Sequence, residues 1–408
     1  MTMPDPQPAE RIHALDAVRA GALLLGVAFH ATLPYLPGPQ IWVVRDVESG
    51  GMAVLFFVLH IFRMTAFFLI AGFFARMLIE RRGAGGFVRN RLIRIALPLV
   101  AFWPLVLALI MAMFIWGAAA ANGGSLPTDQ PPPPPPTLET FPLTHLWFLY
   151  VLLWLYAGAL AVRGIVSLID RGGRLRAGLA DPAMRWLTAT PFVAVVLAAP
   201  LALAFAVQPG WFAWGGIPTP DKGFVPNATA LVGFGTAFAF GWLLHRQQAL
   251  LAALRRWWPV QLIAAAAVTI AFLAVFGDRA PFTIVEGDAK TALAACYALA
   301  VWTWTLGLTG AALRFLTRER PAVRYVADAS YWIYIIHLPV VMAFQVLLFP
   351  VALPAFGKWA LVVAASFLIL IASYHLLVRH SWLGKWLNGR KLPWRKPRAE
   401  AAGMVAGA

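Results

Sequence analysis

Long apolar runs separated by short polar stretches make up most of the chain. Each run extends over about twenty residues, the length that a helix needs to cross the hydrocarbon core of a bilayer. Only helices or closed barrels satisfy every backbone hydrogen bond in hydrocarbon, and runs of this length favour helices. We therefore predict an all-α, polytopic membrane protein of about ten transmembrane helices, at residues 14–36, 51–78, 95–118, 145–163, 187–207, 227–245, 258–277, 289–313, 327–349 and 358–378.

The basic residues alternate between loops along this pattern. Arg63 lies within a predicted span, and most of the other Lys and Arg residues lie in the N-terminal segment, in every second loop and in the C-terminal tail. Loops rich in Lys and Arg stay on the cytoplasmic side. We therefore expect both termini to be cytoplasmic, which requires an even number of spans. The alternate loops, together with the first residues of the spans that follow them, hold only Arg45, Lys222, Arg279, Lys290 and Lys358.

Composition agrees with a membrane protein. The 408 residues are 61% hydrophobic and 12% charged, whereas roughly a quarter of the residues of a soluble domain are charged. The net charge of +16 is scattered between apolar runs, so we expect membrane lipids as partners and no nucleic acid. A single cysteine, Cys296, excludes a disulfide within the chain. We expect one transmembrane domain over residues 1–378 and a basic cytoplasmic tail over 379–408.

Two predicted outer loops differ from the rest. Residues 119–144 contain a proline run from Pro131 to Pro136, which should form an extended polyproline II segment. Residues 208–226 are rich in Trp, Gly and Pro. The aromatic side chains of this second loop are either interfacial anchors or a stacking platform for sugar rings near the outer mouth.

The first span carries charged and titratable side chains on one face. Asp16 and Arg19 are three residues apart, and eleven helical steps from Arg19 to His30 return to nearly the same face, about 16 Å further along the axis. These three residues therefore line one stripe that leads from the cytoplasmic end into the membrane. The alternative is an Asp16–Arg19 pair at the interface, with His30 bonded to a neighbouring carbonyl.

The second span repeats this feature. His60 and Arg63 share a face, and Arg63 lies too deep for its side chain to reach either interface easily. A charge within a span costs a few kcal/mol and needs a reason. Arg63 requires an anionic partner, a cluster of carbonyls or a water-filled cavity; a fixed ion pair between two helices is the structural alternative. Gly72 further along predicts close helix packing.

Arg91 and Arg94 share a face at the cytoplasmic mouth of the third span. Guanidinium groups match the geometry of phosphate oxygens. These two arginines are therefore candidates for binding a phosphate-bearing ligand. Simple cytoplasmic positive charge is the alternative.

The ninth span has a polar face formed by Ser330, Tyr334 and His337, which follow one another at steps of four and three. His145 opens the fourth span on the outer side. Such a face suggests the wall of a substrate cavity, and a hydrogen-bonded packing seam between helices is the alternative. No metal-ligand spacing and no motif of the common soluble enzymes occurs.

Five segments together resemble the acyltransferase-3 family of integral-membrane acyltransferases. The first-span signature of that family, an arginine and a histidine separated by ten residues, matches Arg19 and His30. Its third-span signature, two arginines separated by two residues, matches Arg91 and Arg94. The segment around His60 and Arg63 is most similar to the branch that adds succinyl groups to periplasmic glucans. The five segments are LDAVRAGALLLGVAFH (15–30), HIFRMTAFFLIAGFF (60–74), RLIRIALPLV (91–100), THLWFLYVLLW (144–154) and ADASYWIYIIHLPVV (327–341).

The resemblance implies transfer of an acyl group, succinyl or acetyl, from cytoplasmic acyl-coenzyme A to a hydroxyl of a periplasmic or other envelope glycan, across the bacterial inner membrane. Acyl-coenzyme A would be a donor substrate, with no permanently bound cofactor or metal. Arg19, Arg91 and Arg94 would hold the donor phosphates, and Asp16 would orient Arg19. Asp16 lies about 21 Å from His30 along an ideal helix, so it does not orient that ring directly.

His30 would act as a general base on the sugar hydroxyl or as an acyl-accepting nucleophile. A neutral imidazole is the less costly form inside a membrane, and a base needs the neutral form. Arg63 would stabilise the oxyanion or hold a succinyl carboxylate, and His60 completes the expected catalytic set.

Two other classes of protein fit part of the pattern. A transporter or flippase for a sugar or lipid-linked sugar also needs intramembrane charge, but the sequence shows no internal repeat of the kind found in transporters. A structural subunit of an envelope complex would tolerate replacement of His30.

Overall fold

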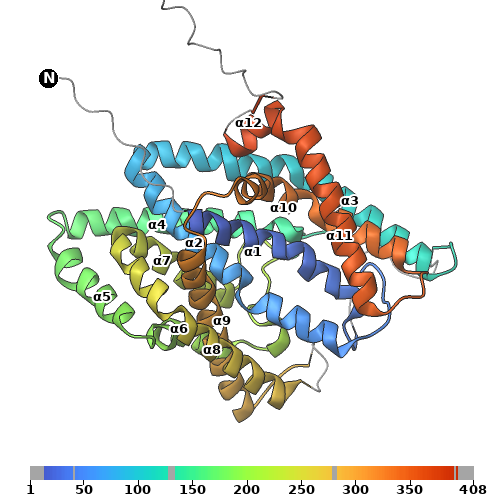
Figure 1. The fold of residues 1–408 in the computed structure, drawn as a ribbon, viewed down its shortest axis with the longest axis horizontal. Helices are drawn as coiled ribbons and strands as arrows, with labels where there is room; N and C mark the ends of the chain where they lie inside the picture. The colour runs from blue at the N-terminus through green and yellow to red at the C-terminus, as the bar shows by residue number, and fades with distance from the viewer. Residues whose placement is uncertain (1–12, 40–41, 127–133, 278–282, 390–391, 394–408) are drawn as a thin grey trace, which may run out of the picture.

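The computed structural model is a bundle of helices (Figure 1). It describes the whole chain except residues 1–12, 40–41, 127–133, 278–282, 390–391 and 394–408. The described part contains no β-strand and only isolated β-bridges between loops. Its α-helices are α1 His13–Thr32, α2 Gly50–Arg91, α3 Leu97–Ala121, α4 Trp147–Ile169, α5 Asp181–Ala189, α6 Val193–Val207, α7 Ala228–Arg246, α8 Leu251–Phe276, α9 Asp288–Phe315, α10 Pro321–Leu348, α11 Ala355–Ser373 and α12 Trp382–Asn388.

The helices have the length and composition of membrane spans. In the described residues, 8 helical segments are long and apolar enough to cross a bilayer, or 9 with the bent pair that includes α5 and α6. Large apolar side chains cover their outward faces, as at Leu203 (69% exposed), Ile263 (71%) and Leu368 (70%). Extended apolar surfaces of this kind are typical of proteins that contact lipid. The chain is a multi-pass membrane protein, and the expected ten spans and cytoplasmic termini stay predictions.

The second and third predicted spans form one helical segment of 72 residues, Gly50–Ala121. The expectation of a loop between residues 78 and 95 is wrong, because the basic stretch there is helical apart from Gly83, whose φ of 68° breaks the helix. Arg and Leu are strong helix formers, so the polar stretch marks the edge of the apolar run rather than the end of the helix. At 1.5 Å per residue the segment is roughly 100 Å long, far more than one crossing needs.

The fifth predicted span, 187–207, is also different in the structure. The helical segment Arg176–Ala189, which includes α5, meets α6 at an angle of 106°. Thr190, between them, has an extended backbone, which the following Pro191 favours. The amphipathic helix α5 leaves Trp186 76% exposed, as in helices that lie along a membrane surface.

Helix α1 packs against α2 and α10, and α2 also packs along α7 and α9. Glycines allow the closest approach: a Cβ on Gly72 would lie 1.9 Å from the carbonyl oxygen of Phe238, and one on Gly241 would lie 1.8 Å from that of Leu69. The close packing predicted at Gly72 is confirmed. Small residues at such crossings let two helix backbones meet.

The loop at 208–226 folds back into the bundle. Trp211 and Trp214 are each 1% exposed, with Trp211 stacked on Phe205 and Trp214 edge-on to Phe57. Both expectations for these tryptophans, interfacial anchor and sugar-stacking platform, are therefore wrong, because the rings fill the core beside the N-terminal part of α2. Part of the other unusual loop, residues 131–133 of its proline run, lies outside the described residues.

Candidate active site

The polar stripe of α1 continues as one face of the helix. Asp16, Arg19, Leu23, Gly26 and His30 follow one another at steps of three or four, and each of them lines a cavity. Arg19 Nη2 lies 3.1 Å from Asp16 Oδ1, so the pair expected at the cytoplasmic end is present. The stripe therefore runs along a series of cavities from the Arg19 end of α1 to its His30 end.

Three neighbouring cavities follow this stripe. The histidine cavity, about 80 Å³, surrounds His30. The middle cavity, about 440 Å³, shares Leu23 and Phe148 with it. The arginine cavity, about 750 Å³, shares a second wall with the middle cavity. The residues common to the middle and arginine cavities are Arg19, Phe74, Arg91 and Arg94.

The arginine cavity carries an excess of positive charge. Its wall contains Arg81 and Arg82, which come just before the helix break at Gly83, together with Arg91 and Arg94. Among the described residues, none of these four guanidinium groups has a carboxylate within ion-pair distance. Arginines clustered without acidic partners form a site that suits phosphate oxygens.

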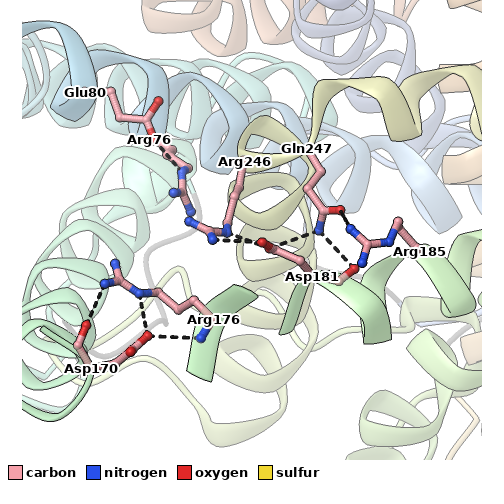
Figure 2. Close-up of polar contacts among 8 residues, drawn as sticks. All are labelled: Arg76, Glu80, Asp170, Arg176, Asp181, Arg185, Arg246 and Gln247. Atoms are coloured by element: carbon pink, nitrogen blue, oxygen red, sulfur yellow. Dashed lines mark hydrogen bonds and ion pairs between the residues drawn. The ribbon is translucent and has the colours of Figure 1, made fainter. Parts of the chain in front are cut away.

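Neighbouring arginines are neutralised instead. Arg76 donates to Glu80 at 2.7 Å, and Arg246 makes two hydrogen bonds to the Asp181 carboxylate, at 2.6 and 2.8 Å. Figure 2 shows these contacts beside the Asp170–Arg176 pair, which closes the turn before α5. Ion pairs therefore attach α5 to α7, whereas Arg81, Arg82, Arg91 and Arg94 are the arginines of the cavity without such a pair among the described residues.

Arg91 and Arg94 are held by aromatic rings and by the C-terminal segment. The Arg91 guanidinium lies over the rings of Phe87 and Tyr156, at 5.3 and 4.9 Å from their centroids, and its buried Nε has no hydrogen-bond partner among the described residues. Gly389, at the C-terminal end of α12, approaches Arg94 so closely that a Cβ there would lie 1.7 Å from Arg94 Nη2. The predicted tail therefore begins with a short helix that contributes to the wall near Arg94.

The histidine cavity brings together imidazoles from separate parts of the sequence. His30 comes from α1, His60 from α2, His145 from the turn before α4 and His337 from α10. Ring centroids lie 5.3 Å apart for His30 and His337 and 4.9 Å apart for His145 and His337. His60 is separated from His30 by Phe29, whose centroid lies 5.0 Å from each of the two rings.

Backbone carbonyls determine which nitrogen carries the proton in three of these rings. His60 Nε2 lies 2.8 Å from the Gly215 oxygen, His145 Nε2 lies 3.0 Å from that of Ile335, and His337 Nδ1 lies 2.7 Å from that of Tyr334. A carbonyl only accepts, so each of these nitrogens must be the donor. In the neutral rings, the lone pair then sits on His60 Nδ1, His145 Nδ1 and His337 Nε2, none of which has a partner among the described residues.

Pro339 frees the carbonyl that His145 uses. In a regular helix the N–H of residue 339 would bond to the oxygen of Ile335, but proline has no N–H. Thr144, directly before His145, has φ of 56°, a left-handed backbone conformation that is rare for a β-branched residue. Strain of this kind persists where surrounding contacts fix the chain, so the backbone holds His145 firmly in place.

Arg63 is a buried cation in the same cavity. It is 7% exposed and its guanidinium lies over the Phe29 ring, 4.3 Å from the centroid, a favourable cation–π contact. No Asp or Glu lines the cavity within the described residues. The alternative of a fixed ion pair between two helices is therefore wrong for Arg63. Its burial must be explained by a cluster of carbonyls, by water in the cavity or by an anionic ligand.

Sequence reasoning missed several lining residues. Gly26 lets two groups approach α1, because a Cβ there would lie 3.0 Å from Arg63 Nη1 and 3.5 Å from His337 Nε2. Ile217 and Thr219 of the folded-back loop and Tyr297 of α9 also line the cavity. In the sequence, the Gly215–Gly216 pair was the available signal that this loop approaches the bundle closely. In the structure, Gly216 has φ of 55° and lies against Tyr297.

The predicted site residues fall into two groups that the middle cavity joins. His30, His60, Arg63, His145, Tyr334 and His337 line the histidine cavity, whereas Asp16, Arg19, Arg91 and Arg94 line the arginine cavity and Ser330 the middle one. Tyr334 donates from its hydroxyl to the His145 carbonyl, at 2.7 Å. Within the described residues, no group of three or more His, Cys, Asp or Glu side chains is arranged to hold a metal ion.

Comparison with known proteins decides the family. The model of the acyltransferase-3 family, described as an acyltransferase domain, matches residues 12–378. The chain belongs to this family. It is therefore an acyltransferase by family, and the matched domain contains every predicted site residue.

Two curated relatives are both glucans biosynthesis protein C. The one from Escherichia coli (strain K12) is 35% identical over 151 residues, and the one from Escherichia coli O6:K15:H31 (strain 536 / UPEC) is 34% identical over 151 residues. The similarity spans 36% of this chain and 38% of each relative. No solved structure matches the chain.

Proposed function

We propose that this acyltransferase moves a short acyl group from cytoplasmic acyl-coenzyme A to a hydroxyl of a periplasmic or other envelope glycan, in the bacterial inner membrane. The single observation that carries the proposal is the series of three cavities from the arginine cluster to His30. A phosphate-rich donor with a long, mostly uncharged arm and a reactive thioester at its end matches that series in order. The printed name of the relatives, glucans biosynthesis protein C, supports a glucan acceptor.

The donor enters at the arginine cavity. Coenzyme A carries a pyrophosphate and a ribose phosphate, and Arg19, Arg91 and Arg94 stand where this cavity meets the middle one. Charge-assisted hydrogen bonds from these guanidinium groups hold the phosphates. Arg82 lies in the wall of the same cavity and adds charge at the entrance. Asp16 orients Arg19 through their ion pair.

The pantetheine arm occupies the middle cavity. Phe67, Phe74 and Phe148 supply apolar contacts there, while Ser330 and Tyr331 supply polar ones. The thioester at the end of the arm then lies past Leu23, in the histidine cavity. A cavity needs on the order of 10–15 Å³ of such volume for each water, so about 80 Å³ accommodates a short acyl group.

The reaction takes place at His30. As a base, the ring takes the proton of the acceptor hydroxyl while that oxygen attacks the thioester carbonyl carbon. The C–S bond breaks, and the coenzyme A thiolate receives the proton that His30 had taken. As a nucleophile, His30 instead accepts the acyl group first and then passes it to the hydroxyl. Either course needs a neutral ring with a free lone pair.

Arg63 supplies the positive charge of the histidine cavity. It stabilises the oxyanion that forms at the thioester carbonyl, or it binds the carboxylate of a succinyl group. The absence of Asp and Glu from the described lining of this cavity supports the second role, because a buried cation needs an anionic partner. A dicarboxylic donor would bring that partner with it.

The membrane orientation completes the proposal. The 72 residues of Gly50–Ala121 make two crossings separated by the break at Gly83, and with the bent pair this gives ten crossings with both termini cytoplasmic. The arginine cavity then faces the cytoplasm, where acyl-coenzyme A is present. The basic loops favour the same orientation.

Mass spectrometry of envelope glycans tests the proposal. Glycans are compared between cells that have the gene, cells that lack it and cells that carry His30→Ala at equal membrane abundance. We expect one acyl mass to be lost from the glycans in both altered strains, and full acylation with His30→Ala would contradict the proposal. Acyl-coenzyme A should also protect the purified protein from thermal unfolding, whereas a sugar transporter or flippase would not be protected.

A further inference from the structure

His30 lacks what usually orients a reactive histidine. Such a ring generally has its second nitrogen bonded to a carboxylate or a carbonyl, which selects the tautomer. His30 Nδ1 is buried and has no partner among the described residues. Asp16 is too far along α1 to reach it, and no Asp or Glu lines the histidine cavity in the described chain. The orienting group must therefore be something other than a carboxylate.

His337 is placed to be that group. It is 2% exposed, and its ring centroid lies 5.3 Å from that of His30. An imidazole nitrogen lies about 1 Å from its ring centroid, so facing nitrogens at this separation are near hydrogen-bonding distance. Within the part of the chain that the structure describes, His337 Nε2 and His30 Nδ1 are both buried and both without a hydrogen-bond partner. Each ring therefore carries a nitrogen that is available to the other.

The direction of that hydrogen bond is already determined. His337 Nδ1 donates to the Tyr334 carbonyl at 2.7 Å, so the neutral ring keeps its lone pair on Nε2. Nε2 is then an acceptor only, and a hydrogen bond between the rings requires the proton to sit on His30 Nδ1. The remaining nitrogen, His30 Nε2, must then carry the lone pair.

We propose that His337 is the positioning residue of the reaction and that its Nε2 accepts a hydrogen bond from His30 Nδ1–H, which leaves His30 Nε2 as the reacting nitrogen. The inference rests on the acyl transfer proposed above. The Tyr334 carbonyl, His337 and His30 form a chain in which each member sets the tautomer of the next. These three hydrogen-bonded groups are uncharged, which suits a site buried among apolar helices.

The step balances in atoms and charge. His30 Nε2 takes the proton of the acceptor hydroxyl, and the ring becomes an imidazolium whose Nδ1–H is held by His337 Nε2. The hydroxyl oxygen bonds to the acyl carbon, and the C–S bond breaks. The coenzyme A thiolate takes the proton from His30 Nε2, and both rings return to their starting tautomers. His337 donates nothing to the substrate, so it acts only through His30.

Three substitutions at His337 separate positioning from packing. His337→Leu keeps much of the volume but removes the acceptor. His337→Gln places an amide oxygen near the position of Nε2, where it can accept from His30 Nδ1–H. His337→Asn is also an amide, but it is shorter and reaches only the Tyr334 carbonyl. The Asn and Gln variants form a pair matched in chemistry, so they decide the question even if the leucine variant does not fold.

The measurement is steady-state acyl transfer by the purified full-length protein in liposomes, with acyl-coenzyme A as donor. We expect His337→Leu and His337→Asn to lower kcat by about 10–100-fold, within the range that proton transfer contributes, with KM for the donor unchanged. His337→Gln should recover a large part of kcat. Histidine ¹⁵N spectra should show the Nδ1–H tautomer of His30 in the wild type and a mixture of tautomers in His337→Leu.

Two results would overturn the inference. Wild-type kcat in His337→Asn would show that His30 needs no orienting acceptor, and equal losses in the Gln and Asn variants would assign His337 to packing. His30→Ala, measured in parallel, separates this from the proposed function. If His30→Ala is inactive while the His337 variants are fully active, only the positioning role fails; if His30→Ala is itself active, the proposed function fails.

Discussion

The Nε2 atom of His145 lies 3.0 Å from the carbonyl oxygen of Ile335, on a different helix and far away in the sequence. That oxygen is available because the residue four positions later is Pro339, which has no N–H to donate. A proline within a transmembrane helix here has a specific consequence. It supplies an acceptor that fixes one ring of the histidine cavity.

Replacing this proline should reduce activity without reducing stability. In Pro339→Ala the new N–H competes with His145 for the Ile335 oxygen, so we expect kcat to fall roughly tenfold, at the lower end of what one proton-transfer group contributes. Alanine is favoured over proline in a helix by about 3 kcal/mol, so the thermal unfolding temperature should not decrease. The control is Pro200→Ala in α6, where the residue four positions earlier, Val196, is half-exposed. An equal loss of kcat in that variant would refute the explanation.

A side chain at Gly26 should disturb the Arg63 guanidinium. A methyl group there would lie 3.0 Å from Arg63 Nη1 and 3.5 Å from His337 Nε2, so Gly26→Ala should displace Arg63 and lower acyl transfer at least tenfold, while α1 remains helical. Gly21→Ala, on the same helix and with no atom of the described part of the chain within 4 Å of the added Cβ, is the matched control. Transfer assays and circular dichroism on both variants check this, and full activity in Gly26→Ala would exclude a role for the Arg63 position.

Arg63 should distinguish between acyl donors if it binds a carboxylate. A hydrogen bond to a charged group contributes about 1.5–3 kcal/mol, so Arg63→Ala should lower kcat/KM for succinyl-coenzyme A about 10–100-fold more than for acetyl-coenzyme A. Arg63→Lys keeps the charge and should retain part of the preference. An equal loss with both donors would remove the carboxylate role and leave stabilisation of the oxyanion.

The C-terminal helix should influence donor binding through Arg94. Gly389 has φ of 79°, and an added Cβ would lie 1.7 Å from Arg94 Nη2. Gly389→Ala should therefore displace the guanidinium and raise KM for acyl-coenzyme A several-fold, with kcat at saturation unchanged. Gly123→Ala introduces similar backbone strain (φ of 64°), with no atom of the described residues within 4 Å of the added Cβ, so its KM should remain that of the wild type. A normal KM in Gly389→Ala would show that Arg94 does not hold the donor.

Much of the fold was readable in the sequence because the bilayer restricts the choices. Long apolar runs become helices, and small residues such as Gly72 mark where helices cross. The polar face of α1 was also readable, since turn counting alone places Arg19 and His30 on one side. The break at Thr190–Pro191 was not recognised, because hydropathy averages over a window and does not detect a single proline boundary.

The site was only partly predictable for a different reason. Each polar residue was identified by its cost within an apolar run, but a sequence does not say which histidines meet. The convergence of His30, His145 and His337 depends on the packing of α1 against α10 and on the turn before α4, which is hydrogen-bonded to α10. Trp211 and Trp214 were misplaced because a loop rich in Trp, Gly and Pro looks the same whether it lies at the interface or folds into the core.

Labelling of a single cysteine tests the central claim most directly, namely that the acyl donor extends from the arginine cavity to the histidine cavity. Cys296→Ala removes the one native cysteine, and Leu23→Cys places a thiol in the wall shared by the middle and histidine cavities. Asn122→Cys, at the exposed end of α3, is the control. We predict that acyl-coenzyme A slows modification of Leu23→Cys by a small thiol reagent and leaves Asn122→Cys unaffected; equal modification of Leu23→Cys with and without bound donor would contradict the account.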